Sequence, residues 1–270
     1  MGHRYLLQQL RDTAQRLQLE PAVVTFRSHP KLVLTGSCPP LLTTTDERLA
    51  LLGRYTDRII CLDFPSVQSL TAEAFMRKLH DEYDVQVLLM GYDHHFGSDR
   101  LASIDDYIRR GRKAGIQVIL QEQAPEGAVS STRIRRAITE GNIAEANRLL
   151  GYPYFLSGTV VHGRGLGRQL GFPTANIQAD AHKLIPAAGV YRTEINSLTA
   201  ITNIGTNPTV GNTATTIEVH IPGFTGNLYD QHLTLTFVSR IRGEHRFESL
   251  DALKAQLGAD ESVCRAMLAK

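Results

Sequence analysis

The spacing of apolar residues changes abruptly near Tyr152-Pro153, and this change limits the folds that the chain can adopt. Before it, short apolar runs such as AVVTF (22–26) and VQVLLM (85–90) alternate with amphipathic helical patterns. Strands that are apolar throughout and separated by helices indicate a parallel sheet with helices on both faces. The first half is therefore predicted to be a doubly wound parallel α/β domain.

The second half has a different pattern, with no long helical periodicity between Phe155 and Ser239. Short β-rich segments such as FLSGTVVHG and TTIEVHI are separated there by glycine, proline and asparagine turns. This pattern predicts a small antiparallel β-barrel, followed by a terminal amphipathic helix from about Ser249 to Leu268. We place the boundary so that the domains are 1–152 and 153–270.

The composition is that of an ordinary globular protein. A formal charge of +2 gives no reason to expect a nucleic-acid or membrane partner. Cys38, Cys61 and Cys264 are widely spaced without a C-x-x-C motif, which is typical of a reducing compartment. No apolar stretch approaches the ~18 residues of a membrane span, and the start has no signal-peptide core. We therefore expect a cytoplasmic protein.

A glycine-rich stretch, GTVVHGRGLGRQLGFPTANI, carries the strongest chemical signal. Within its residues 163–168, which we call the glycine loop, Gly163, Gly165 and Gly167 alternate with other side chains. Glycines let backbone N–H groups approach phosphate oxygens closely, and Arg168 adds positive charge. For the glycines alone, a plain glycine-rich hairpin is an equally good interpretation.

Thr174 and Asn176 follow the glycine loop and stand two residues apart. In an extended segment this spacing places a hydroxyl and an amide oxygen on the same side. Hard, neutral oxygens of this kind suit Mg²⁺ that brings its own waters and the phosphates of a nucleotide. The pair therefore makes phosphate and magnesium binding the better interpretation of the loop.

The second half closely resembles the riboflavin kinases. The segments that carry the resemblance follow in the family's order: VVHGRGLGRQLGFPTANI, IPAAGVYRTEI, TNIGTNPTV, TTIEVHI and IRGEHRF. The resemblance implies that domain 153–270 transfers a phosphoryl group from ATP to the 5′-hydroxyl of riboflavin, which forms FMN.

The same resemblance implies roles for individual residues. Thr174 and Asn176 match positions that hold Mg²⁺ and the nucleotide phosphates, beside an ATP-binding glycine loop. Glu218 matches the general base that receives the proton of the ribityl hydroxyl. Arg242 and Glu244 match positions near the flavin. Without the resemblance, Glu218 would be an outward-facing strand residue and the other two a surface ion pair.

The first half resembles the FMN adenylyltransferase module of bacterial bifunctional FAD synthetases. The segments that carry this resemblance are VVTFRSHP, LLMGYDHHFGSDR and VSSTRIRRAI. The resemblance implies that domain 1–152 is a nucleotidyltransferase that converts FMN and ATP to FAD. Ser131 and Thr132 are helix-capping types, so free N–H groups at a helix start and Arg135 can face a phosphate. Asp93 keeps the family pattern. A plain capped helix is the alternative for this segment.

The start of the chain matches only the end of a family motif. Members of the adenylyltransferase module begin with a strand ending in Gly-x-Phe-Asp-Gly-Val-His-x-Gly-His, and only Gly2 and His3 have counterparts here. Without that strand and its first histidine, a buried strand position is unfilled and adenylyl transfer is impaired. Either the numbering begins at an internal methionine or this activity has decayed, and the intact later motifs favour the first explanation.

The sequence thus predicts a bifunctional enzyme that takes ATP, riboflavin, FMN and Mg²⁺. One alternative is a riboflavin kinase with a non-functional first domain, and another is a nucleotidyltransferase for a non-flavin substrate. A third is an RNA-binding module that uses Arg133, Arg135 and Arg136. The chain has no tryptophan and no interleaved aromatic and basic residues, which argues against the third.

Overall fold

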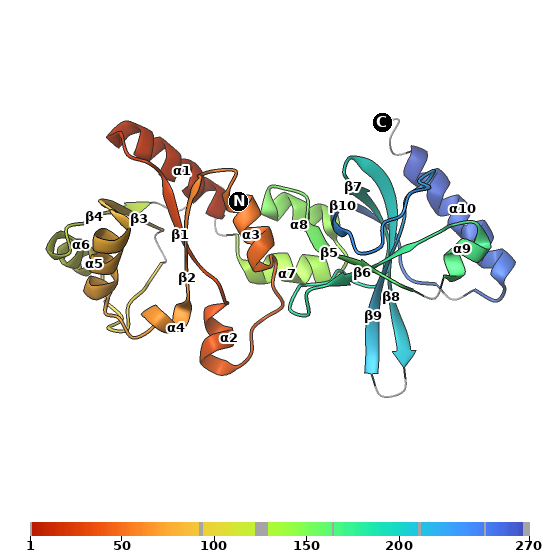
Figure 1. Cartoon of the computed structure of the whole chain (residues 1–270), viewed down its shortest axis with the longest axis horizontal. Helices are drawn as coiled ribbons and strands as arrows, with labels where there is room; N and C mark the ends of the chain where they lie inside the picture. Colours follow the sequence, from red (N-terminus) through yellow and green to blue (C-terminus); the bar gives the residue numbers. More distant parts are fainter. Residues whose placement is uncertain are drawn as a thin grey trace. The chain divides into compact units, whose positions relative to one another are not determined.

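The computed structural model describes residues 2–91, 94–121, 129–163, 165–209, 212–245 and 247–266 (Figure 1). The chain forms two compact units. Unit 1 comprises Met1–Pro39 and Thr45–Val129, and unit 2 comprises Pro40–Thr44 and Ser130–Lys270.

Unit 1 is the predicted parallel α/β domain. Strand β1 pairs in parallel with β2, and β3 pairs in parallel with β4. Within the described residues the two pairs form separate sheets. The elements are α1 (Gly2–Leu17), β1 (Ala22–Phe26), α2 (Pro30–Thr35), α3 (Thr45–Leu52), β2 (Arg58–Leu62), α4 (Phe64–Val67), α5 (Ala72–Tyr83), β3 (Val87–Gly91), α6 (Ile104–Lys113) and β4 (Gln117–Gln121).

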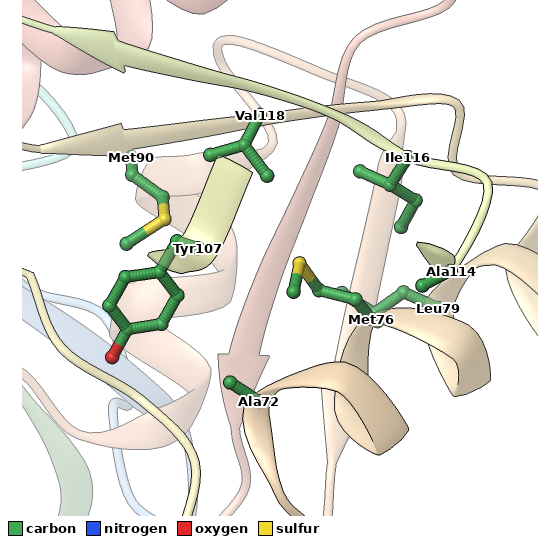
Figure 2. Close-up of a cluster of buried hydrophobic side chains, with 8 residues drawn as sticks. All are labelled: Ala72, Met76, Leu79, Met90, Tyr107, Ala114, Ile116 and Val118. Carbon is green, nitrogen blue, oxygen red and sulfur yellow. The ribbon is translucent and has the colours of Figure 1, made fainter. Parts of the chain in front are cut away.

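The core of unit 1 lies between α5, α6 and the β3–β4 pair (Figure 2). Met76 and Leu79 of α5 have no exposed surface, and each such side chain stabilises the fold by about 1.5–3 kcal/mol. Val24 of β1 packs against this cluster and also against the cluster beneath β2. The two strand pairs therefore have apolar clusters with shared neighbours, although no strand within the described residues joins the pairs.

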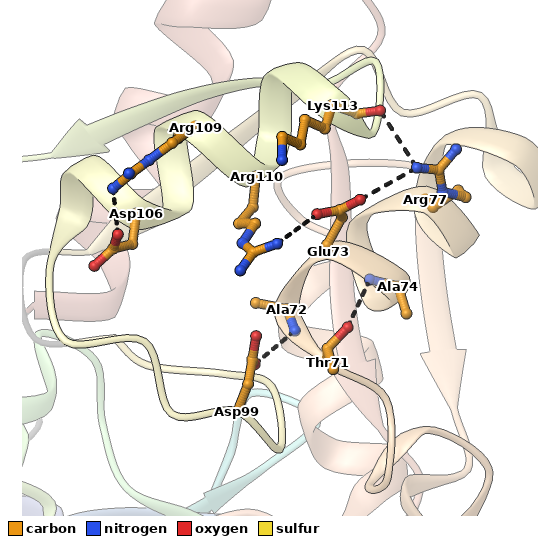
Figure 3. A network of polar contacts seen from close by, with 10 residues as sticks. All are labelled: Thr71, Ala72, Glu73, Ala74, Arg77, Asp99, Asp106, Arg109, Arg110 and Lys113. Atoms are coloured by element: carbon orange, nitrogen blue, oxygen red, sulfur yellow. Dashed lines mark hydrogen bonds and ion pairs between the residues drawn. The ribbon is translucent and has the colours of Figure 1, made fainter.

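Polar contacts join the exposed sides of α5 and α6 (Figure 3). Glu73 of α5 accepts hydrogen bonds from Arg110 of α6 at 3.0 Å and from Arg77 at 3.4 Å. The Arg110 hydrogen bond lowers the pKa of Glu73. Thr71 caps α5 by accepting from the Ala74 amide at 3.2 Å. These contacts fix the α5–α6 pair on the core.

Unit 2 contains the predicted antiparallel barrel, closed in the order β10-β5-β6-β9-β8-β7, with a terminal helix against its outside (Figure 1). Inside it, Tyr191 and Phe237 are fully buried with their ring centroids 5.4 Å apart. The elements of unit 2 are α7 (Ser131–Thr139), α8 (Ile143–Leu150), β5 (Phe155–Val161), α9 (Leu166–Leu170), β6 (Ala175–Ala179), β7 (Gly189–Ile195), β8 (Leu198–Thr209), β9 (Asn212–His220), β10 (His232–Arg242) and α10 (Leu250–Ala266).

Helices α7 and α8 belong to the compact unit of the barrel, which takes up the chain again at Ser130, while the domain boundary at 152/153 stays a prediction. Asn147 links α8 to β10 and to the residue before β5 through two side-chain hydrogen bonds. Its Nδ2 donates to the Phe237 carbonyl at 3.0 Å, and its Oδ1 accepts from the Tyr154 amide at 2.7 Å. The apolar periodicity marks where the secondary structure changes, not which core a helix joins.

Replacing Asn147 with alanine removes both of these part-buried hydrogen bonds and leaves their partners unsatisfied. We expect Asn147→Ala to lower the free energy of unfolding by about 2–3 kcal/mol in denaturant titrations. Asn227 is a matched control because it is exposed and its side chain accepts one hydrogen bond, from the Tyr229 amide. Equal losses in Asn147→Ala and Asn227→Ala would contradict the role of Asn147 as a link.

A carboxylate on α8 holds α7 and α8 together. Glu145 accepts hydrogen bonds from Arg148 at 2.7 Å and from Arg133 at 2.6 Å. The Arg148 hydrogen bond is the largest cause that lowers the pKa of Glu145, from 4.5 to about 2. Because this pKa is lower in the folded state, the interaction stabilises the fold fully above pH 4.5 and is lost as the pH falls toward 2.

This titration gives a pH-dependent prediction. We expect the unfolding free energies of the unaltered chain and of Glu145→Gln to differ above pH 4.5 and to converge as the pH approaches 2. Denaturant titrations of both proteins across this range measure the difference. A gap that is constant with pH would show that the carboxylate charge of Glu145 contributes nothing.

Candidate active sites

A row of polar side chains crosses three strands on the outer face of the barrel. Glu218 of β9 pairs with Asn176 of β6 on one side and with Asn203 of β8 on the other. Directly opposed residues in an antiparallel pair project from the same face. The neighbours of Glu218 in its own strand, Ile217 and Val219, are buried inside the barrel, so Glu218 faces outward. We call Asn176, Glu218 and Asn203 the polar row.

The glycine loop lies directly on Thr174 and Asn176. A Cβ atom on Gly163 would lie 1.9 Å from Asn176 Nδ2, and one on Gly167 would lie 3.1 Å from Thr174 Oγ1 and 2.3 Å from the Phe172 carbonyl. Real Cβ atoms do not come this close. Position 167 therefore requires glycine because the clash is with backbone, whereas a Cβ at position 163 would displace the Asn176 side chain. The loop backbone therefore covers the two side chains that the sequence assigned to phosphate and Mg²⁺.

Gly165 has a different reason to be glycine. Its φ of +71° is left-handed, and nothing lies within 4 Å of where its Cβ would stand. It opens the short helix α9, on which Arg168 is exposed. The three predicted loop glycines thus have separate physical roles, and the exposed Arg168 guanidinium is accessible to an anionic ligand.

The sequence did not single out two residues near Thr174 and Glu218, namely His220 and Asn203. His220 Nδ1 lies 2.9 Å from the Pro173 carbonyl, next to Thr174, and its ring packs edge-on against Phe172. Asn203 was missed because its place depends on the pairing of β8 with β9. The period-two alternation around Glu218 could have identified its face, but not its neighbours.

Arg242 and Glu244 do not form the ion pair with each other that was the alternative interpretation. Arg242 donates from Nε at 3.0 Å and from Nη2 at 2.8 Å to the carboxylate of Asp260 on α10. Asp260 is only 2% exposed. Glu244 turns elsewhere, since its Oε1 lies 3.0 Å from where a Cβ of Gly205 would stand. That position is two residues along β8 from Asn203 of the polar row.

The residues present fit a magnesium ion that is held jointly with nucleotide phosphates. Within the described ranges, no three His, Cys, Asp or Glu side chains form a metal cluster. Thr174 and Asn176 instead offer neutral oxygens beneath the glycine loop, with the Glu218 carboxylate next to Asn176. This is the donor set that Mg²⁺ accepts when most of its ligands are waters and phosphate oxygens.

The predicted adenylyltransferase residues are distributed over both units. Gly2 and His3 stand in the first turn of α1 in unit 1. Asp93 lies outside the described residues. Ser131 and Thr132 open α7 in unit 2, where their side chains are exposed.

The start of α7 has the geometry of an anion-binding helix end. The capping residue is Ser130, whose Oγ accepts from the Arg133 amide at 3.2 Å. Arg135, one turn further on, donates from Nε to the Pro40 carbonyl at 2.8 Å. The N–H groups of Ser131 and Thr132 are thus at the positive end of the helix dipole.

Comparisons with known proteins agree for both halves. A riboflavin kinase family model matches residues 150–268, and an FAD synthetase model matches residues 1–133. The bifunctional riboflavin kinase/FMN adenylyltransferase of Pseudomonas fluorescens is 38% identical, over 99% of this chain and 89% of the relative. The chain belongs to this bifunctional family. It is therefore an enzyme with a riboflavin kinase region and an FAD synthetase region.

A second bifunctional relative and a solved structure show a similar extent of similarity. The protein of Escherichia coli K12 is 36% identical over 98% of this chain and 88% of its own length. The crystal structure of a macrolide-efflux protein from Streptococcus pneumoniae superposes with a TM-score of 0.84, at 34% identity, over 98% of this chain and 89% of that one. Among the described residues, no helix has the length and apolar content needed to cross a membrane.

Proposed function

We propose that this chain phosphorylates riboflavin at the outer face of its barrel and adenylylates the resulting FMN with elements of the N-terminal half. The polar row beneath the glycine loop is the observation that carries the kinase assignment. It places a carboxylate, Glu218, beside the side chains that are fit to hold Mg²⁺ and phosphates. ATP, riboflavin and FMN are the substrates, and the cytoplasm, which keeps the free cysteines reduced, is the proposed location.

In the kinase reaction, Glu218 accepts the proton of the riboflavin 5′-hydroxyl as its oxygen attacks the γ-phosphorus of ATP. A bond forms between that oxygen and phosphorus, the bond to the β-phosphate oxygen breaks, and ADP leaves. Thr174 and Asn176 would hold Mg²⁺, which neutralises phosphate charge when bound. Backbone N–H groups of the glycine loop and the Arg168 guanidinium hold the remaining phosphate oxygens.

Flavin contacts are proposed for the loop after β10. The Glu244 carboxylate stands over Gly205 near Asn203, so it lies at one end of the polar row. Arg242 has its guanidinium on Asp260 and contributes by holding this loop against α10. We therefore assign direct contact with the flavin to Glu244 and give Arg242 a supporting position.

In the synthetase reaction, a phosphate oxygen of FMN attacks the α-phosphorus of ATP, and pyrophosphate leaves. The amides of Ser131 and Thr132 at the start of α7, with Arg135, would hold the ATP phosphates. Gly2, His3 and Asp93 are assigned to the same reaction by their match to the family motifs. His3 would supply a hydrogen-bond donor to the phosphates, and Gly2 would allow their close approach.

Product analysis tests both activities separately. Riboflavin with ATP and Mg²⁺ should give FMN and then FAD, and FMN with ATP and Mg²⁺ should give FAD and pyrophosphate. FMN that accumulates without FAD would show that only the kinase works. Consumption of ATP without any flavin product would contradict the proposal as a whole.

A further inference from the structure

A segment of the N-terminal half belongs to the kinase unit. The chain passes between the two units after Pro39, after Thr44 and after Val129. Pro40–Thr44, which we call the tie segment, is thus part of unit 2 although both of its flanks belong to unit 1. A single linker would need the chain to pass between the units only once, whereas this chain passes three times. We therefore ask which contacts hold the tie segment on unit 2.

Backbone hydrogen bonds hold the tie segment on unit 2. The Leu41 amide donates to the His182 carbonyl at 2.7 Å, and the Leu184 amide donates to the Leu41 carbonyl at 2.9 Å. Leu41 and Lys183 form a short parallel bridge through these bonds. The Lys183 ammonium adds a third bond by donating to the Leu42 carbonyl at 2.8 Å.

Lys183 is built into the barrel unit and is only 4% exposed. Its Nζ lies 4.7 Å from the ring centroid of Tyr154 and 5.3 Å from that of Phe155. A buried ammonium is costly unless hydrogen bonds and aromatic faces replace its water. An apolar side chain of similar length could fill this space, but it could not donate a hydrogen bond to the Leu42 carbonyl as the ammonium does.

The tie segment also contacts α7, the helix whose start is assigned to adenylyl transfer. Its first carbonyl, that of Pro40, accepts from Arg135 Nε at 2.8 Å, next to the anion-binding start of α7. Directly after the segment, Thr45 opens α3 and its Oγ1 donates to the Arg27 carbonyl at 2.6 Å, just past the end of β1. Ligands of doubly wound folds bind at such carboxyl ends of strands.

We propose that Lys183 is a positioning residue for adenylyl transfer, although it lies within the residues matched by the riboflavin kinase model. By holding the tie segment on unit 2, it fixes the Pro40 carbonyl that orients Arg135. Lys183 itself touches neither the polar row nor the glycine loop among its described contacts. The inference rests on the proposed assignment of α7 to the synthetase site.

The experiment uses the full chain with Lys183→Met, Leu41→Pro and the double variant. Leu41→Pro removes the amide donor from the other side of the contact and lies outside the kinase match. Lys183→Met should lower kcat/KM for ATP in FAD formation from FMN about tenfold or more, as loss of a hydrogen bond to a charged group does. Leu41→Pro, which loses a neutral backbone hydrogen bond, should lower it about three- to tenfold. Riboflavin phosphorylation should stay within about twofold, and Lys254→Met, an exposed lysine on α10, is the control.

Three results decide the question. Because both single variants release the same contact, their effects in the double variant should be much less than additive. Hydrogen exchange should rise at Leu184 in both variants, and at Leu41 in Lys183→Met, because proline at position 41 has no amide hydrogen. Unchanged FAD formation in either variant with exposed amides would overturn the proposal, as would equal loss of both activities in Leu41→Pro. If the unaltered chain makes no FAD, the proposed synthetase function itself has failed. Hydrogen exchange at Leu184 would then still show whether Lys183 holds the tie segment on unit 2.

Discussion

Replacing Glu218 with glutamine should reduce riboflavin phosphorylation about 100- to 10,000-fold, the usual contribution of a general base. Glutamine keeps the size of the side chain and its place between Asn176 and Asn203, but it cannot accept the proton of the 5′-hydroxyl. The loss should therefore appear in kcat, while the KM for ATP changes little. Steady-state rates of FMN formation from riboflavin and ATP measure both parameters.

Two controls separate this effect from damage to the fold. Glu194→Gln alters another partly exposed strand carboxylate, on β7 and outside the polar row, and should leave FMN formation unchanged. FAD formation from supplied FMN by Glu218→Gln should also remain at the level of the unaltered chain. If Glu218→Gln forms FMN at the normal rate, another group accepts the proton and the proposed mechanism is wrong.

The sequence predicted the classes of both halves because periodicity is a local signal. Apolar strands between amphipathic helices gave parallel pairs, and short strands between turns gave the antiparallel barrel. The position of α7 and α8 could not be predicted in the same way. Buried faces such as Ile143 and Leu149 show that α8 packs on a core, but not which core. That choice depends on distant partners, such as the Phe237 carbonyl that Asn147 contacts.

In the candidate kinase site, the sequence likewise predicted local neighbours but not residues brought together by strand pairing. Thr174 and Asn176 were paired by their period-two spacing, and both do meet the glycine loop. Asn203 could not be found because only the register of β8 and β9 brings it beside Glu218. The tie segment was missed for the same reason, since the contact of Leu42 with Lys183 joins residues that are far apart in the chain.

Arg242 illustrates how a motif residue can have a structural partner that its motif does not contain. Its carboxylate partner, Asp260, stands on α10, and Gln256 Nε2 also donates to that carboxylate at 2.8 Å. Nearby, Val190 and Cys264 are buried in the apolar contact between α10 and the barrel. Burial raises the pKa of the Cys264 thiol, which keeps it protonated. The Arg242–Asp260 pair thus joins α10 to the loop that carries Glu244.

Breaking this pair should have the largest effect on stability. Asp260→Ala leaves the Arg242 guanidinium, which is 23% exposed in its side chain, without its buried carboxylate. Removal of one partner from a buried ion pair costs about 3–5 kcal/mol of unfolding free energy, because the remaining charge is not compensated. Arg242→Met should cost a similar amount. Denaturant titrations of both variants give these values.

The double variant Arg242→Met, Asp260→Leu distinguishes an ion pair that holds the fold from a flavin contact. With both charges replaced by apolar groups, we expect most of the lost stability to return, since such replacements are often neutral. If Arg242 acts only by supporting the loop, riboflavin binding should return with stability. Recovered stability with riboflavin affinity still reduced about tenfold or more would show that the guanidinium contacts the flavin directly, against the supporting position assigned to it here.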